Sequence, residues 1–367
     1  MKVTDPNLSR RRTATDRQIE RGRRRMVPNN ERGTSNRRPT VRTVAEAADV
    51  SPSLVSFVFN ERPGVSEPTR QHVRNVAAEL GYQPDPRARE LRTGKATIMG
   101  LVVRNVANPF FNEILMGMQE RAEGDGVSVL AMDSQFDAAR EEAHVRSLAS
   151  RRTAGLAIVP VGDASTVRLW QQLQPTAPLA IVNARLTAAP EIPHVTPDDE
   201  TAVDLAFHHL YEMGHRKIAL LSAPPQLMPD GDRTARYLQL CSEHHVLPSP
   251  IYASLRGDGL TEHLSEVFGM PTAERPTAII TNSDHTAAYV YHAIRHLGLI
   301  VGRDISVIGH DDLATSSLLS PGLTTVRLDL REMGRQAYRR LTEPGLGNHR
   351  EPVELIVRGS TGPLREA

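Results

Sequence analysis

A helix-turn-helix pattern occupies residues 44–60, VAEAADVSPSLVSFVFN. Val44 and Ala48 are apolar residues at helical spacing, and they predict a first helix that ends before Ser51. Ser51 is suited to cap a second helix, and Pro52 stands at its first position, where the missing N–H costs nothing. The pattern therefore predicts two short helices joined by a tight turn.

A third helix follows the pattern. Ser66 is suited to cap it, and Val73 and Leu80 belong to its apolar face. Gly81 supplies the glycine that commonly follows the end of a helix. Three short helices of this kind, over residues 39–83, are typical of a helix-turn-helix DNA-binding headpiece.

Charge is distributed unevenly around this headpiece. Residues 1–95 hold 20 basic and 11 acidic residues, whereas residues 96–367 hold 24 basic and 32 acidic ones. Residues 1–38 read as a basic, disordered arm that could touch phosphates, unless translation begins at Met26 and the first part is not made. Residues 84–95, with two prolines and four basic residues, read as a hinge.

Beyond the hinge, short apolar runs alternate with amphipathic segments. This alternation predicts an α/β core over residues 96–367, with parallel strands covered by helices on both faces. So many residues indicate two lobes rather than one sheet. The predicted strands lie at 97–103, 127–132, 155–160, 178–183, 217–222, 276–281, 305–309 and 353–357, and the predicted helices at 109–123, 139–149, 199–213, 283–297 and 329–341.

Composition excludes several classes of protein. With 39% hydrophobic and 24% charged residues, the chain is not mostly disordered. The one cysteine, Cys241, can form no intramolecular disulfide, which fits a reducing compartment. The sequence has no apolar run of about 18 residues, and its arginine-rich beginning lacks the apolar core of a signal peptide, so we expect a cytoplasmic protein.

The motifs together resemble the lactose-repressor (LacI/GalR) family of bacterial transcription regulators. The resemblance covers residues 39–363 and is carried by the helix-turn-helix pattern and by RPGVSEPTRQHV, ELGYQP, ARELRTGK, NPFF, MGHRKIALL, ISVIGHDD, SPGLTTVRLDLREMGRQA and VELIVRGSTGP. It implies a two-lobed core like that of periplasmic binding proteins, a homodimer or larger assembly, and a palindromic DNA operator. The chain is expected to cross between the lobes near 195–199, 326–330 and 355–358.

The resemblance also implies which residues contact DNA: Ser51, Pro52, Ser53, Ser56, Phe57 and Asn60 in the headpiece, and Arg87, Ala88 and Leu91 in the hinge. Leu91 would be an apolar wedge in the minor groove. Phe57 stands where many members have arginine, so it would pack on a thymine methyl, unless it packs inside the headpiece. Asp49 replaces the usual glycine of the turn; aspartate tolerates the left-handed conformation better than most residues.

By the same resemblance, a small polar effector, sugar-like in chemistry, would bind between the lobes. The implied contacts are Asn105, Asn108, Phe110, Asn183, Arg233, Ser283 and Asp311. An arginine and a carboxylate suit paired hydroxyls, and an aromatic ring suits a sugar face. For Asn108 and Ser283, the alternative is that each only begins a helix. For Asn105 and Asn183, a purely structural role is equally compatible with the sequence.

No catalytic or metal site is indicated. His310, Asp311 and Asp312 are adjacent, and such residues at a strand end usually diverge; no second partner at metal-ligand spacing follows. We expect no cofactor and no enzymatic activity. The sequence favours a ligand-controlled repressor. It leaves open a regulator controlled by a protein partner and, less favoured, a solute-binding protein or an enzyme on the same scaffold.

Overall fold

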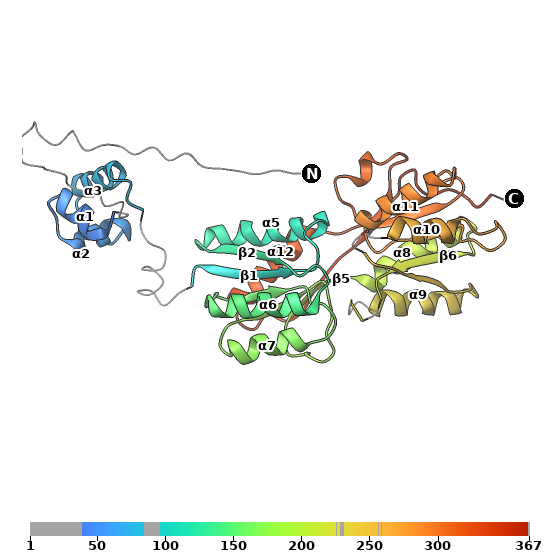
Figure 1. Ribbon diagram of the computed structural model, residues 1–367, viewed down its shortest axis with the longest axis horizontal. Coiled ribbons are helices and arrows are strands. Elements are labelled where there is room, and N and C mark those ends of the chain that lie inside the picture. Colours follow the sequence, from blue (N-terminus) through green and yellow to red (C-terminus); the bar gives the residue numbers. More distant parts are fainter. Residues whose placement is uncertain are drawn as a thin grey trace, which may run out of the picture. The chain divides into compact units, whose positions relative to one another are not determined.

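The computed structural model describes residues 39–83, 96–224, 226–227, 231–255, 257 and 259–365. The chain divides into two compact units, Met1–Pro84 and Asp85–Ala367; Figure 1 shows the helices of the first and the sheets and helices of the second. Within the described residues, no helix has the length and apolar character needed to span a membrane. Each unit is described below by itself.

The headpiece consists of three helices, α1 (Val41–Ala47), α2 (Pro52–Phe59) and α3 (Glu67–Glu79). Ser51 caps α2, its hydroxyl accepting a hydrogen bond from the N–H of Leu54, and Ser66 caps α3 in the same way. Asp49 lies at φ +51° and Gly81 at φ +66°, so both turns adopt the left-handed conformation that the sequence predicted. The helices pack around a small core of buried side chains: Val44, Ala45, Ala48, Val55, Val58, Val73 and Ala77.

The first lobe of the core is built on a six-stranded parallel sheet. The sheet order is β11 (His349–Glu351), β5 (His194–Pro197), β4 (Leu179–Val182), β3 (Leu156–Ile158), β1 (Ile98–Val103) and β2 (Ser128–Asp133). Two helices contact one face, α5 (Pro109–Gly124) and α12 (Leu330–Thr342), and two the other, α6 (Ala138–Ser150) and α7 (Ser165–Leu173). Residues of β1 alternate between the faces, Leu101 and Val103 on one and Val102 on the other.

The second lobe repeats this plan, except that one edge strand is antiparallel to its neighbour. Its sheet order is β12 (Glu354–Ile356), β10 (Thr324–Arg327), β9 (Ser306–Asp311), β8 (Ala278–Ile280), β6 (Ile218–Ser222) and β7 (Ser249–Tyr252). One face of this sheet is covered by α8 (Asp199–Glu212) and α9 (Gly231–Glu243), and the other face by α10 (Leu260–Phe268) and α11 (Asp284–His296). A short 3₁₀-helix, Ser316–Leu318, follows β9.

The chain passes between the lobes three times. It leaves the first lobe between β5 and α8, returns between β10 and α12, and leaves again at Pro352–Val353, between β11 and β12. The third passage comes before the 355–358 that the sequence predicted. Because β11 ends at the same side of its sheet as its parallel neighbours, β12 enters the second lobe there and runs antiparallel to β10. The parallel sheets that the sequence predicted are therefore confirmed, with β12 as an antiparallel strand at the edge of the second.

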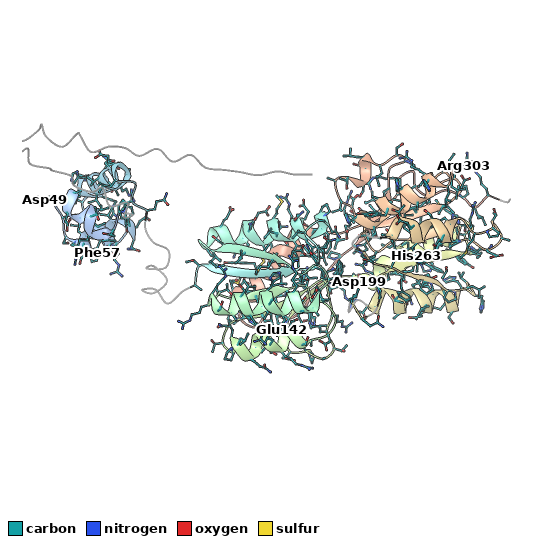
Figure 2. The ribbon with its side chains drawn as sticks, in the orientation of Figure 1. Asp49, Phe57, Glu142, Asp199, His263 and Arg303 are labelled. Carbon is teal, nitrogen blue, oxygen red and sulfur yellow. The ribbon has the colours of Figure 1, made fainter. Side chains whose placement is uncertain are left out.

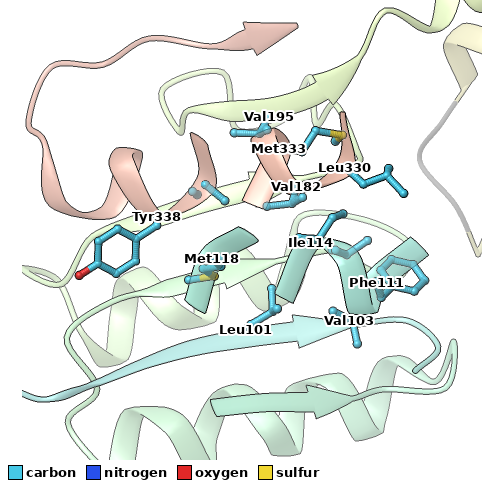
Figure 3. Packing of buried hydrophobic residues seen from close by; sticks show 14 of the residues in the cluster. Leu101, Val103, Phe111, Ile114, Met118, Val182, Val195, Leu330, Met333 and Tyr338 are labelled. Carbon is cyan, nitrogen blue, oxygen red and sulfur yellow. The ribbon is translucent and has the colours of Figure 1, made fainter. Parts of the chain in front are cut away.

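Helices α5 and α12 cross closely in the first lobe (Figure 3). Ile114 and Met118 of α5 pack with Leu330 and Met333 of α12 over the strands of the sheet. The contact is closest at Gly117: a Cβ atom added there would lie 2.0 Å from the carbonyl oxygen of Arg331. A Cβ atom at Gly334 would lie 2.1 Å from the carbonyl oxygen of Ile114. The two helices meet at this distance because both positions lack a side chain.

Ion pairs flank the same crossing. Arg331 Nε lies 2.8 Å from Glu113 and its Nη1 lies 2.9 Å from Glu120; Arg335 reaches Glu120 at 3.1 Å. These side chains are partly exposed, so each pair contributes about 1 kcal/mol or less. The crossing thus holds α12, which comes late in the sequence, against the first helix of the core.

Candidate functional site

The second helix of the headpiece, α2, presents one polar face. Ser51, Pro52 and Ser53 are exposed at its beginning, while Val55 and Val58 are buried in the headpiece core. Exposed residues at the beginning of the second helix are the ones that enter the major groove in helix-turn-helix proteins. The face that the sequence assigned to DNA is therefore available in the isolated headpiece.

Two other predicted contact residues, Ser56 and Asn60, contact each other. Both are half-buried. The side-chain amide of Asn60 donates to the Ser56 carbonyl oxygen at 2.5 Å and lies 3.2 Å from the Ser56 hydroxyl. Asn60 therefore caps the end of α2, a structural role that the sequence analysis did not assign to it.

Phe57 lies outside the core of the headpiece (Figure 2). Its side chain is 39% exposed, and it is absent from the cluster of buried and partly buried residues around Val55 and Val58. The guanidinium carbon of Arg62 lies 5.4 Å from the centre of its ring, within the range of a cation–π contact. An exposed ring beside an arginine favours the DNA contact over internal packing. Arg87, Ala88 and Leu91 lie outside the described residues, so their roles remain predictions.

A pocket between the two lobes of the core brings together all seven residues predicted to contact an effector. The empty space within it, part of which is open to solvent, is about 480 Å³. The carboxyl ends of the strands point to it from both lobes, which is where α/β sheets bind ligands. The lining residues are Arg104, Asn105, Asn108, Phe110, Phe111, Phe136, Asn183, Arg233, Leu255, Asn282, Ser283, Thr286 and Asp311.

Three of the seven predicted residues also hold the local backbone. Asn108 caps α5, its Oδ1 accepting from the N–H of Phe110 at 3.0 Å. Ser283 caps α11 through a reciprocal pair with Thr286. Asn105 Oδ1 accepts from the N–H of Ala107 at 3.0 Å. The structural alternatives stated for these residues are thus present in the fold, at positions that also line the pocket.

Arg233 is held at the pocket wall by contacts with Asp199 and Asn282. It lies in the first turn of α9, where its Nε donates to Asp199 Oδ1 at 2.5 Å and its Nη1 to the carbonyl oxygen of Asn282 at 2.9 Å. Its side chain is 12% exposed. The guanidinium is therefore held in one orientation before any ligand binds.

Asp311, at the end of β9, is the carboxylate of the pocket. Its Oδ1 lies 2.9 Å from His310 Nδ1, so these adjacent side chains meet, contrary to the expectation that they diverge. Asp312 does turn away, to Arg327 and Arg358. The second oxygen of Asp311, Oδ2, is buried and has no hydrogen-bond partner among the described residues. Burial raises the pKa of Asp311 well above its usual range and lowers that of His310.

An oxygen in this state can accept from a ligand hydroxyl or amine. Leaving such a group unpaired costs about 1–3 kcal/mol, so a ligand that satisfies it gains that much.

A second, larger space of about 1500 Å³, part of it open to solvent, lies beside the crossings and shares Asp311 as a wall. Its other lining residues include Pro109, Leu313, Leu328, Leu330 and Val353.

Sequence reasoning missed six residues of the pocket wall, of which Arg104 is the most important. Arg104 directly follows β1 and is only 1% exposed. Its Nη2 donates to the carbonyl oxygen of Asn183 at 2.9 Å. The signal that could have found it was a charged residue placed directly after a fully apolar strand. Among the described residues, no group of three or more histidine, cysteine or acidic side chains is arranged to hold a metal.

Both units match models of known protein families. Residues 40–85 match the family model described as bacterial regulatory proteins, lacI family, and residues 207–361 match the periplasmic binding protein-like domain. The chain is 28% identical over 335 residues to the HTH-type transcriptional repressor CytR of Escherichia coli K12, covering 89% of this chain and 97% of that protein. It is 29% identical to the ribose operon repressor of the same strain, covering 88% and 99%.

A solved structure shows the same architecture. The Lac repressor dimer bound to operator and the anti-inducer ONPF matches with a TM-score of 0.78 and 27% identity, over 89% of this chain and all of that one. A helix-turn-helix headpiece joined to a two-lobed binding core defines a DNA-binding transcription regulator. The chain thus contains a DNA-binding domain that matches the bacterial regulatory proteins of the lacI family and a periplasmic binding protein-like domain.

Proposed function

We propose that this protein is a transcriptional repressor that binds a palindromic operator as a homodimer and is released from it by a small, polar, sugar-like effector in the pocket between the lobes. The observation that carries the proposal is that all seven predicted residues line one pocket, where Asp311 Oδ2 is a buried acceptor that a ligand can satisfy. The relatives support it: the Lac repressor was solved on operator with an anti-inducer, and another relative controls a ribose operon.

The position of the pocket explains how an effector could act on distant DNA. Asn105, Asn108 and Phe110 belong to the first lobe, whereas Arg233 and Asp311 belong to the second. A ligand that contacts both lobes favours one relative placement of them, and it shifts the equilibrium by its difference in affinity for the two placements. The coupling is reciprocal, so operator weakens effector binding by the factor by which effector weakens operator binding.

The relatives named above are transcription regulators, and we propose no enzymatic activity for this chain. A regulator of this kind acts where the chromosome lies, so we place it in the cytoplasm. An effector of protein type remains the other outcome of the experiments that follow.

The first experiment identifies operator and effector together. DNA fragments retained by the purified protein are sequenced, with and without candidate sugars. Retained fragments should share an imperfect palindrome, and at least one sugar or sugar derivative should deplete them. Retention without any shared repeat would contradict the proposed operator, and retention that only a protein fraction reverses would point to a protein effector.

The second experiment tests Asp311. An Asp311→Asn variant keeps the shape of the side chain but exchanges the acceptor Oδ2 for a donor or a weaker acceptor. A lost hydrogen bond to this group costs about 1.5–3 kcal/mol, so the effector concentration for half-release of operator should rise roughly ten- to a hundredfold. Release at the wild-type concentration would remove Asp311 from the site.

A further inference from the structure

His310 and Asp311 are adjacent at the end of β9, and their side chains form a buried pair. His310 Nδ1 lies 2.9 Å from Asp311 Oδ1, and each residue is 4% exposed. A contact of this length between an imidazole nitrogen and a carboxyl oxygen requires a proton between the two atoms. The pair therefore holds one bridging proton, whichever of the two groups donates it.

Each side chain of the pair also has one buried polar atom without a hydrogen-bond partner among the residues that the structure describes. These atoms are Asp311 Oδ2 and His310 Nε2, one at each end of the pair. Asp311 lines the pocket between the lobes, whereas His310 lines a neighbouring space within the second lobe, together with Thr281 and Val326. A ligand in the pocket therefore meets the carboxyl end of the pair and not the imidazole end.

The bridging proton decides where the pair can hold a second one. With the contact between Nδ1 and Oδ1 occupied, the remaining positions are His310 Nε2 and Asp311 Oδ2. An imidazole is ordinarily more basic than a carboxylate, so the second proton is held on Nε2. The pair is neutral as a whole with two protons and carries one negative charge with one.

The charged surroundings of the pair favour its neutral form. Burial raises the pKa of Asp311 and lowers that of His310; Asp284 adds to the effect on Asp311, and Arg233 opposes it. The ionisable side chains around the pair come from several elements. They are Asp284 of α11, Arg233 of α9, Asp199 of α8, Arg104 after β1 on the pocket wall, and, at the end of the same strand, Asp312 with its partners Arg327 and Arg358.

We propose that effector binding at Asp311 Oδ2 and proton binding at His310 Nε2 oppose each other: a hydroxyl of the effector donates to Oδ2, and the pair releases its second proton from Nε2 to solvent. A donated hydrogen stabilises the negatively charged, one-proton pair more than the neutral one. His310 is thus a positioning residue, which acts on the effector through Asp311. This inference rests on the proposed function and adds control by pH to the same site.

The pair is tested first without a sugar. The full-length protein is labelled with ¹⁵N at histidine, and the His310 signals are assigned by their loss in His310→Asn. Nε2 should pass from a protonated to an unprotonated nitrogen in one step as the pH rises. Asp311→Asn should lower the midpoint of this step by about one pH unit or more, because the carboxylate that favours the second proton is gone. A midpoint unchanged by Asp311→Asn, or an Nε2 that never changes its protonation, would overturn the proposal.

Sugar binding is then measured on both sides of that midpoint. The probes are ribose, glucose, galactose and cellobiose. A sugar that binds should bind up to about tenfold more tightly for each pH unit below the midpoint and equally at all pH values above it, since one proton is released. Calorimetry in buffers of different ionisation enthalpy counts that proton. The same affinity on both sides would overturn the proposal, and so would a failure of all four sugars to bind.

Two variants separate positioning from packing. His310→Asn places an amide donor where Nδ1 lies but has no second nitrogen to protonate. It should keep the affinity of the parent at high pH and lose the change at the parent's midpoint. His310→Phe keeps a ring of similar size but leaves Oδ1 without a donor, so it should bind about tenfold more weakly even at high pH. An equal loss at every pH in His310→Asn would leave His310 a packing role only.

His209→Gln is the matched control. His209 is a half-buried histidine on α8 whose ring lies 2.9 Å from the hydroxyl of Thr361, and it does not line the pocket. This variant should reproduce the pH profile of the parent protein. A profile altered as in His310→Asn would show that the pH dependence does not arise at His310.

Operator release separates this inference from the proposed function. If a sugar binds with release of one proton but leaves the operator bound, the coupled pair stands and the repressor mechanism fails. If a sugar releases operator at a concentration that does not change across the midpoint, the mechanism stands and the opposition between effector and proton is wrong.

Discussion

Glu141 is buried on α6 with its carboxyl group between Val161 and Thr166. Burial raises its pKa from 4.5 to about 7, so the folded protein holds this proton more tightly than the unfolded chain does. The contribution of Glu141 to stability is therefore largest below pH 4.5 and decreases as the pH rises to about 7.

Replacing Glu141 should make the folding stability of the protein depend less on pH between pH 4.5 and about 7. The shift corresponds to at most about 3 kcal/mol between the two ends of the window. In urea unfolding at pH 5 and pH 8, Glu141→Gln should lose less stability on going to the higher pH than the parent protein does. Glu142→Gln, at the exposed neighbouring position, is the control and should follow the parent. If Glu141→Gln lost as much stability between pH 5 and pH 8 as the parent protein, the buried carboxyl group would not be the cause of the pH dependence.

Phe57 and Val58 are adjacent on α2 but face opposite environments. Val58 is fully buried in the headpiece core, whereas the Phe57 side chain is 39% exposed. Val58→Ala should therefore lower the unfolding temperature of the headpiece, since it removes buried methyl groups. Phe57→Ala should leave that temperature nearly unchanged and reduce the preference for operator over random DNA. Melting curves and competition binding separate the two; a large loss of stability in Phe57→Ala would favour internal packing instead.

At the level of single residues, the sequence predicted seven residues of the pocket wall but missed the buried Arg104. The seven predicted residues were implied by the resemblance to the lactose-repressor family, and all of them line the pocket. Arg104 was not predicted because one of its partners, the carbonyl oxygen of Asn183, comes from a segment far along the chain. The local signal, a charged residue directly after an apolar strand, marks the position but does not reveal that contact.

The crossing of α5 and α12 depends on two glycines. Gly117→Ala would place a Cβ 2.0 Å from the Arg331 carbonyl oxygen, a backbone atom that cannot move aside without separating the helices. We expect this variant to lower the melting temperature of the core by several degrees, a loss of about 1–3 kcal/mol or more. Gly124→Ala, on the same helix, has open space around the added carbon and should melt within a degree or two of the parent. Equal melting of both variants would show that the crossing relaxes freely.

The elements that the sequence failed to predict are short, and most depend on long-range pairing. The missed strands are β5, β7, β10 and β11, and the missed helices α7, α9 and α10. β11 reads His-Arg-Glu and has no apolar residue; it is a strand because it pairs in parallel with β5, far away in the sequence. By contrast, α9 offered a readable signal: Tyr237, Leu240 and Cys241 are buried at helical spacing.

At the scale of the whole molecule, the distribution of charge predicts how DNA binding responds to salt. The 20 basic residues among the first 95 can neutralise phosphates and release counterions. If the dimer makes about 6–10 phosphate contacts, operator affinity should fall roughly 10³- to 10⁵-fold between 50 and 200 mM salt. Fluorescence anisotropy over a salt series measures this slope. Full affinity of a monomer for a site without a repeat would contradict the dimeric operator complex.

The three passages of the chain between lobes bear on how the protein is made. The headpiece, residues 39–83, is one continuous segment with its own core, so it can fold as soon as it leaves the ribosome. The first lobe cannot, because α12 and β11 are synthesised only after most of the second lobe. Until then Ile114 and Met118 of α5 lack the helix that covers them. A chain truncated after β10 would therefore have a folded DNA-binding headpiece but an incomplete, aggregation-prone core. Such a product could not bind an effector between its lobes.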